Sequence, residues 1–284
     1  MGNVIIPRQP LWLFATTRYY KIDVMQYGIS HFYTFFANEE ITDATEVIPD
    51  GSVDIIFLCR ENNPEAICYG TRLQVHKVND IPIFKKGDYI FGVRFLPGNV
   101  SFLKGFPAEA LIENAVDFTL IRKKKKMVDE ICQCRNFPKQ ISIFMKEYLL
   151  EYKENREEMA KDKKIQIYLL QRILDSGGQV RVQDLSRETV FSKRYLNQLF
   201  HNEYGLSPKE FEKIIRLQTV LSELNKEEKI VDIACKAGYY DQSHLLKEFK
   251  QIMGISPSKY KIRLKSMDFR EKLIVISSDR YHLF

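Results

Sequence analysis

Short segments with apolar residues at helical spacing, separated by turn residues, fill the chain from residue 165 onward. Helices are expected over 165–175, 182–188, 192–203, 207–224, 230–237 and 242–253. Gly177, Gly205 and Gly254 follow three of them, and glycine commonly closes a helix in the left-handed conformation. Ser192 suits an N-cap, and Pro208 lies in a first helical turn, where its missing N–H costs nothing. The pattern therefore predicts an all-helical C-terminal domain.

The first part of the chain has a different pattern, with short runs rich in β-branched and aromatic residues between turn formers. Strands are expected over 31–36, 53–58, 66–69 and 89–95. A helical apolar stripe over 138–155 predicts a packed helix after them. We expect an α+β protein whose N-terminal domain is a β-rich sandwich or cupin-like barrel ending in helices. The expected divisions are this domain at 1–156, a charged linker at 157–164, the all-α domain at 165–265 and a tail at 266–284.

The composition agrees with two globular domains and indicates the cellular compartment in which the chain acts. The 284 residues are 45% hydrophobic and 28% charged, and no apolar run reaches the ~18 to 20 residues of a bilayer span. The first twenty residues lack the features of a secretory signal. Five scattered cysteines are typical of reduced thiols rather than a disulfide framework. We expect a cytoplasmic protein without a membrane partner.

Positive charge is concentrated in the C-terminal part. The chain has a net charge of +6. From Lys163 onward there are 22 Lys and Arg residues against 15 Asp and Glu residues, and the remainder holds 21 against 22. A basic part joined to a neutral part indicates that the basic part binds a polyanion. Charge alone does not distinguish DNA from RNA or an anionic membrane surface.

An internal repeat is the most specific signal in the sequence. At an offset of 49 residues, Leu196 matches Leu245, Phe200 matches Phe249, and the run 205–208 (GLSP) matches 254–257 (GISP). Upstream of these residues the better offset is 48, so the second turn carries one extra residue. Each copy has a short helix, a tight turn and a second helix, which is the helix-turn-helix arrangement that places its second helix in the DNA major groove.

The second helix of each unit has an apolar face and a face suited to reading DNA. Arginine suits guanine, asparagine and glutamine suit adenine, and an apolar side chain can contact the thymine methyl group. The alternative is that these are ordinary exposed residues on a helical bundle, but two units in register favour DNA. The helix between them spans about 27 Å, which would hold the two recognition helices near one DNA turn, about 34 Å, apart. The residues facing out are Arg194, Asn197, Gln198 and His201 in the first unit, and Gln242, Ser243, Leu246 and Lys247 in the second.

Residues 163–263 resemble the DNA-binding module of AraC/XylS-family transcription regulators. The family pattern G-[FY]-x-D-x-S-x-[FL]-x-x-x-F-[KR]-x-x-x-G-x-[ST]-P-x-x-[YF] runs from Gly238 to Tyr260 almost without gaps. The first unit departs from it, because Val190 stands where the family usually has glycine in the turn. A β-branched residue is costly at positive φ. We therefore expect either an altered turn backbone or a less regular first unit.

The resemblance implies a bacterial, nucleoid-associated regulator that binds two adjacent major-groove segments of promoter DNA, with RNA polymerase as the usual partner. Whether it acts as an activator or a repressor stays open. The base-reading positions that it implies are Arg194, Asn197, Gln198, Gln242, Ser243, Leu246 and Lys247, and His201 shares the face of the first three. Phosphate contacts are expected from Lys193, Lys250 and Lys259, whose charges set register without reading sequence.

Three segments of the first domain, 49–57, 92–98 and 105–118, resemble a poorly characterised β-rich domain that precedes this module in some regulators. The resemblance implies a sensor or a dimerisation scaffold and names no ligand. If the Arg94 side chain faces inward, it is a candidate for binding an anionic effector, but we expect it to face outward into solvent. His31 and His76 lack further ligands at metal-binding spacing, so no metal and no cofactor is expected.

Redox chemistry at a cysteine pair and enzymatic catalysis are two other possibilities for the first domain. Cys132 and Cys134 point apart on a helix, which favours buried or incidental thiols over a redox pair. An enzyme domain addressed to DNA would need a catalytic set, a phosphate-binding glycine-rich loop or metal spacing, and none is found. We therefore expect no enzyme. Two alternatives remain for the regulator, one switched by a small effector or by dimerisation and one whose first domain only dimerises without an effector.

Overall fold

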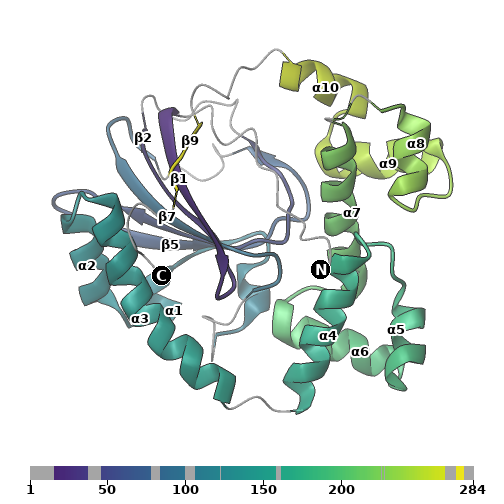
Figure 1. The fold of residues 1–284 in the computed structure, drawn as a ribbon, viewed down its shortest axis with the longest axis horizontal. Helices are drawn as coiled ribbons and strands as arrows, with labels where there is room; N and C mark the ends of the chain where they lie inside the picture. The colour runs from purple at the N-terminus through teal and green to yellow at the C-terminus, as the bar shows by residue number, and fades with distance from the viewer. Residues whose placement is uncertain are drawn as a thin grey trace.

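A computed structural model describes residues 16–37, 46–77, 84–99, 106–121, 123–157, 161–224, 226, 228–265 and 273–277 (Figure 1). The first domain consists of β1 (Thr16–Gln26), β2 (Ile29–Ala37), β3 (Glu46–Val47), β4 (Asp54–Leu58), β5 (Glu65–Tyr69), β6 (His76–Lys77), β7 (Tyr89–Phe95), the 3-10 helix η4 (Ala108–Leu111), β8 (Ala115–Asp117), α1 (Phe118–Ile121), α2 (Lys125–Gln133) and α3 (Phe137–Glu157). The helical part consists of α4 (Lys161–Asp175), α5 (Val182–Thr189), α6 (Lys193–Tyr204), α7 (Pro208–Leu224), α8 (Ile230–Lys236), α9 (Gln242–Met253) and α10 (Pro257–Lys265). After it comes β9 (Leu273–Val275).

The β-rich first domain predicted from the sequence is confirmed, and its centre is one seven-stranded sheet. The strand order is β8-β5-β4-β7-β2-β1-β9, and β3 pairs only with β6 in a separate small sheet. Neighbouring strands are antiparallel except β1 and β9, which are parallel. Three of these strands, β1, β8 and β9, lie outside the runs that the sequence predicted.

The helices α1, α2 and α3 cover one face of the sheet (Figure 1). Stacked and edge-on aromatic rings fill the space between, with Phe32 against Phe91 at 5.9 Å and Phe57 against Phe144 at 6.2 Å between ring centroids. The alternation of side chains along a strand places the next residues on the opposite face. There Tyr19, Tyr33 and Phe35 stack side by side.

The helical part has two cores that share α7 as a rod. The first core packs α4, α5 and α6 against the N-terminal half of α7. The second packs α8, α9 and α10 against its C-terminal half. The predicted helices are present, with ends that differ by a few residues. The sequence placed a linker at 157–164, but α3 extends to Glu157 and α4 already begins at Lys161, so most of that charged run belongs to helices.

Loops of the first domain contact the helical part along the length of α7. Ile48 is fully buried in the second core, and the Pro49 carbonyl accepts a hydrogen bond from Gln218 of α7 at 2.7 Å. The backbone N–H of Val75 donates to the carbonyl of Ile252 in α9 at 3.0 Å. Near the other end of α7, η4 packs against α6. The first domain therefore touches both halves of the helical part.

Candidate nucleic-acid interface

The first helix-turn-helix unit consists of α5, a turn and α6. The Ser192 hydroxyl accepts a hydrogen bond from the backbone N–H of Tyr195 at 3.2 Å, so it caps α6 as the sequence predicted. Leu196, Leu199 and Phe200 are buried in the first core. Of the predicted base-reading residues, Arg194 and Gln198 are exposed, whereas Asn197 and His201 are half-buried. The four thus lie on the face of α6 that the core leaves open.

The turn of the first unit keeps its left-handed backbone despite the valine. Val190 ends α5 at φ 63° and ψ 11°, and its side chain is 91% exposed. The equivalent residue of the second unit is Gly238, at φ 72°. Of the two alternatives that the sequence left, the altered backbone is wrong, because Val190 takes up the conformation that a glycine would have. The cost is local strain without any compensating burial.

The second unit consists of α8, a turn and α9. The Asp241 carboxylate accepts a hydrogen bond from the backbone N–H of His244 at 2.7 Å and caps α9. Leu245 and Phe249 are buried, at the positions that match Leu196 and Phe200 of the first unit. Gln242, Ser243 and Lys247 are exposed, whereas Leu246 is half-buried and packs against the second core.

Most of the predicted DNA-contacting side chains have no partner within the described part of the chain. There, no hydrogen bond or ion pair engages the side chain of Arg194, Gln198, Gln242 or Lys247. Lys193, Lys250 and Lys259 are exposed, and only Lys193 has a polar neighbour in that part, the Gln183 amide oxygen at 3.4 Å. An unpaired cation at the surface is available to a phosphate.

A buried polar network that the sequence did not indicate joins the second unit to α7. Arg216 Nε donates to the Glu248 carboxylate at 3.2 Å, and the Tyr239 hydroxyl donates to the same carboxylate at 2.8 Å. The guanidinium also lies 4.9 Å from the centroid of the Tyr239 ring. Glu248 is buried, and both of these hydrogen bonds end on its carboxylate. The network fixes the orientation of α9 on the rod.

The comparisons with known proteins agree with this geometry. Residues 185–263, which run from α5 to α10, match the family described as "Helix-turn-helix domain". This is a helix-turn-helix domain of the AraC type. The AraC-type domain is thus the part of the chain in which the repeat, both recognition helices and the excess positive charge lie.

Curated relatives match about half of the chain or less. The chain is 26% identical to the Msm operon regulatory protein of Streptococcus mutans over 142 residues, 49% of this chain and 50% of that protein. It is 32% identical to the HTH-type transcriptional regulator ExsA of Pseudomonas aeruginosa over 82 residues, 28% of this chain and 29% of that protein. The chain therefore spans about half the length of the first relative and less of the other.

Two solved structures illustrate the range of similarity. ToxT of Vibrio cholerae is 15% identical, with a TM-score of 0.35 over 88% of this chain and 98% of that one. The DNA-binding domain of AdpA, solved with a target DNA, is 18% identical, with a TM-score of 0.34 over 36% of this chain and 93% of that one.

Arg94, the predicted effector-binding residue, lies in the first domain and not in the AraC-type domain. Its outward, solvated orientation was the expectation, and that expectation is wrong. The side chain is 13% exposed, and its terminal nitrogens bind Asp54 at 2.9 Å and Asp50. Asp54 also accepts a hydrogen bond from the Tyr33 hydroxyl at 3.2 Å. Burial raises the pKa of Asp54 to about 6, although Arg94 acts to lower it.

The pairing of Arg94 links the open face of the sheet to the AraC-type domain. Asp50 belongs to the loop whose neighbour Pro49 accepts the hydrogen bond from α7. A side chain in place of Gly51 would approach the ring of Phe211 in α7 to 2.8 Å, so the loop lies directly on the rod. The chain of contacts therefore runs from Arg94 through Asp50 to α7.

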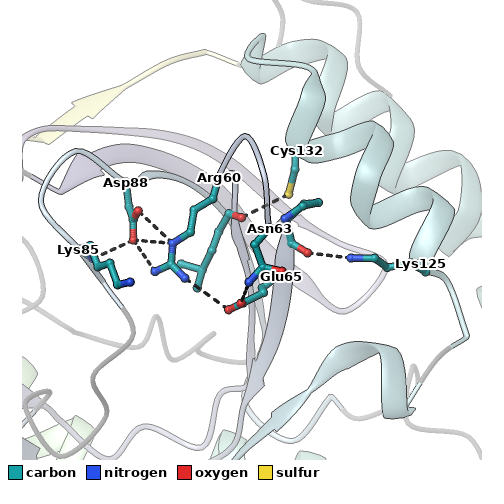
Figure 2. Close-up of polar contacts among 9 residues, drawn as sticks. Arg60, Asn63, Glu65, Lys85, Asp88, Lys125 and Cys132 are labelled. Carbon is teal, nitrogen blue, oxygen red and sulfur yellow. Dashed lines mark hydrogen bonds and ion pairs between the residues drawn. The ribbon is translucent and has the colours of Figure 1, made fainter.

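The other candidate groups of the first domain serve its packing. Figure 2 shows Arg60 between Asp88, at 2.6 Å from Nη2, and Glu65, at 3.5 Å from Nη1, and these ion pairs join the β4–β5 hairpin to the start of β7. Cys132 does not turn toward Cys134. Its thiol donates to a carbonyl of β4 at 3.7 Å and lies beside Cys59, and this contact together with burial raises its pKa. A high pKa disfavours the thiolate and hence redox chemistry.

The first domain contains two histidines, His31 and His76. Burial lowers the pKa of His31 well below its usual value, and Ser30 Oγ lies 3.0 Å from its Nδ1. His76 lies in β6, but its side chain is outside the described residues.

Within the described ranges, no helix combines the length and the apolar character needed to cross a bilayer.

Proposed function

We propose that the chain is a sequence-specific transcription regulator that binds promoter DNA through two adjacent major-groove segments. The observation that carries the proposal is the pair of helix-turn-helix units on one rigid rod, each with a capped recognition helix and an open polar face. The α7 rod of 17 residues is about 26 Å long, and recognition helices packed beside its two ends would lie near the ~34 Å between successive major-groove segments on one side of DNA.

In this proposal α6 and α9 enter the groove and read bases. Arg194 pairs with guanine, whereas Asn197, Gln198 and Gln242 suit adenine. Leu246 is the weakest of the predicted positions, because it packs on its own core. The residues assigned to bases are Arg194, Asn197, Gln198, His201, Gln242, Ser243, Leu246 and Lys247, and those assigned to phosphates are Lys193, Lys250 and Lys259.

The first domain acts in this proposal as a regulatory domain, through a small effector or through dimerisation. The contacts from Arg94 through Asp50 to α7 support the effector version, because a ligand that displaced the Asp50 carboxylate from Arg94 would loosen the loop on the rod. The expected downstream partner is RNA polymerase, and the expected location is the bacterial cytoplasm at the nucleoid. Both follow from the resemblance of the helical part.

An effector-independent regulator is the second candidate, and the same arginine favours it. Asp50 and Asp54 already neutralise the guanidinium, so Arg94 offers an anion no free charge. One described cavity, between the sheet and α2 and α3, measures about 20 Å³ and holds no more than a water molecule. Comparing DNA binding by native protein with protein refolded from denaturant, which is free of carried-over small molecules, separates the two candidates.

Selection of bound fragments from a random duplex pool tests the proposal directly. We expect a motif with two blocks of specified bases separated by about one helical turn. Affinity for the selected site should exceed that for random duplex and should fall steeply with salt, because bound phosphates release counterions. Equal affinity for selected and random DNA at physiological salt would remove the claim of specificity.

A further inference from the structure

The turn of the second unit carries a tyrosine that neither the repeat nor the domain packing explains. Tyr240 is the extra residue of this turn, since Val190 corresponds to Gly238 and the N-cap Ser192 to Asp241. Its side chain is 93% exposed, and no described residue makes a hydrogen bond or ring contact with it. The neighbouring Tyr239, in contrast, is buried in the network with Glu248.

The recognition helices of the two units also differ in charge at their starts. In α6 the first helical residue is Lys193, the predicted phosphate contact, and Arg194 follows it. At the matching position of α9 stands the neutral Gln242, and the first turn of α9 contains no lysine or arginine. The second unit therefore lacks a cation where its recognition helix enters the groove.

We propose that Tyr240 supplies this missing contact by binding the sugar-phosphate backbone at the edge of the major groove. A residue just before a recognition helix lies where the DNA strand borders the groove, while the first helical residues reach the bases. The Tyr240 hydroxyl donates to a phosphate oxygen, and the ring packs on the adjacent deoxyribose. The inference rests on the proposed function, because it needs the second unit to bind DNA.

Two substitutions test the contact, and salt dependence identifies its kind. Tyr240→Phe removes one hydrogen bond to a charged acceptor and should weaken binding to selected and random duplex alike by about tenfold or more. Tyr240→Ala should weaken it further. The slope of log affinity against log salt should stay unchanged in both, because a neutral hydroxyl releases no counterion, whereas Lys193→Ala should lower it by about one.

Leu150→Ala, which truncates an exposed side chain on α3 of the first domain, serves as the matched control and should change nothing. If the wild-type protein binds no duplex, the proposed function has failed. If the wild type binds and Tyr240→Ala binds equally well, only the Tyr240 contact is wrong. A loss confined to the selected site would also overturn it, because that result describes a base contact.

A second inference rests on the segment that follows α10. The strand β9 returns to the first domain and pairs in parallel with β1, with Tyr19 opposite Leu273 and Lys21 opposite Val275 (Figure 1). The N–H of Ile276 donates to the Lys21 carbonyl at 2.8 Å. The helix-turn-helix match ends at residue 263, so this strand lies outside it.

The same end of the molecule holds further contacts between the second unit and the first domain. Arg263 of α10 forms an ion pair with Glu46 at 2.7 Å, and the N–H of Val75 donates to α9. At the other end Glu109 of η4 lies 3.5 Å from His201 of α6. Each acidic residue places negative charge of the first domain beside a DNA-binding unit, where it opposes the approach of phosphate.

We infer that β9 is a strap that holds the second unit against the first domain, and that its release favours DNA binding. The strand forms only three residue pairs, and Leu273 and Ile274 are half-buried, so the strap is a short element that can detach without unfolding the sheet. Detachment would remove one link and leave those made by Glu46 and Val75, so the second unit would break fewer contacts when it adjusts to the groove.

Two variants test the strap. Ile274→Pro removes an N–H and blocks strand pairing, and a chain ending at Lys265 lacks the strap altogether. In both, we expect faster amide exchange at Lys21, whose peptide groups face β9, and an affinity for selected duplex raised by about three- to tenfold, the scale of a modest coupling between sites. Val275→Thr, at an exposed position of the same strand, is the control and should change neither.

If both variants expose β1 to exchange but leave DNA affinity unchanged or lower, the regulatory role is wrong. If exchange at β1 is unchanged, the strap itself is wrong. If neither the variants nor the wild type bind duplex, the proposed function fails instead.

Discussion

The two helix-turn-helix units have the same frame but complete their cores differently. In the first unit α4 supplies Leu169 and Ile173, and all fully buried members of that core come from the helical part. In the second unit α10 supplies the buried Tyr260. Its core also takes Ile48, which is fully buried, from a loop of the first domain, and Val75 packs at its margin. The second unit is thus the one whose core includes a fully buried residue of the first domain.

The two units also differ in the charge at the start of their second helices and in their contacts with the first domain. The first unit presents Arg194 and Lys193, whereas the second presents neutral side chains at the matching positions. Contact with the first domain reaches the second unit through its core and through Glu46. It reaches the first unit through Leu73 and Ile112 at the margin of its core and through η4 at the end of α6. Gly205 permits that contact, because at φ 74° a side chain there would strike the backbone of Glu109 at 2.6 Å.

The largest expected effect comes from truncating Ile48, the residue that the first domain contributes to the second core. Ile48→Ala should cost about 2 to 5 kcal/mol of stability, as truncation of a buried aliphatic side chain does. The loss should appear as faster amide exchange in α9 with little change in α6. Ile173→Ala is the matched variant in the first core and should give the reverse pattern. Equal effects of each variant on both helices would contradict the comparison.

Two neighbouring cations of the first unit should behave differently on DNA. Arg194→Ala should cost about 1 to 3 kcal/mol on the selected site and relax selectivity at one position, because the lost contact is to a base edge. Lys193→Ala should weaken selected and random duplex alike and lower the salt slope by about one. Binding is measured on matched and single-base-changed sites at several salt concentrations. A uniform loss in Arg194→Ala would mean that Arg194 contacts a phosphate and not a base edge.

The rod carries a buried carboxyl that makes stability depend on pH. Burial raises the pKa of Glu212 in α7 to about 7, from an ordinary value of 4.5. The folded chain therefore binds this proton more tightly than the unfolded chain, so stability falls as pH rises from about 4.5 to about 7 and the penalty is complete above that. Glu212→Gln should be more stable than wild type by on the order of 1 kcal/mol at about pH 8 and equal to it at about pH 4. Chemical unfolding at both pH values checks this, and a constant difference would refute the assignment.

The smallest expected effect concerns the turns. Val190→Gly relieves the left-handed strain but adds freedom to the unfolded chain, so it should stabilise the protein by about 1 kcal/mol or less. Gly238→Val, the reverse change in the second unit, should destabilise it, because the Cβ would also crowd Gln179 at 2.7 Å. The melting temperatures of both variants, compared with that of the wild type, test these predictions. Destabilisation by Val190→Gly would show that the exposed valine has a structural role.

The repeated unit could be predicted from the sequence because its signals are local. Apolar residues such as Leu196 and Leu245 recur at helical spacing, Ser192 occupies an N-cap, and Gly205 closes a helix, so each feature depends on neighbours within a few residues. The β-rich nature of the first domain was predictable for the same reason, from runs of alternating and β-branched residues.

The features that escaped prediction depend on residues far apart in the chain. Arg94 was expected in solvent because nothing in its own strand offers a partner, yet Asp54 and Asp50 lie beside it through strand pairing across 40 and 44 residues. The pairing of β9 with β1 joins opposite ends of the chain. The burial of Ile48 in the second core depends on the packing of two domains, which no neighbour in the sequence indicates.

The central claim, that both units read DNA at once, is tested most directly by protection of guanine N7 from methylation on the selected site. Guanine N7 lies in the major groove, so a recognition helix shields it. We predict two protected blocks on one face of the DNA, centred about one turn of ~10 base pairs apart, with Arg194→Ala losing protection in one block only. A single protected block with the wild-type protein, or loss of both blocks in Arg194→Ala, would contradict the account.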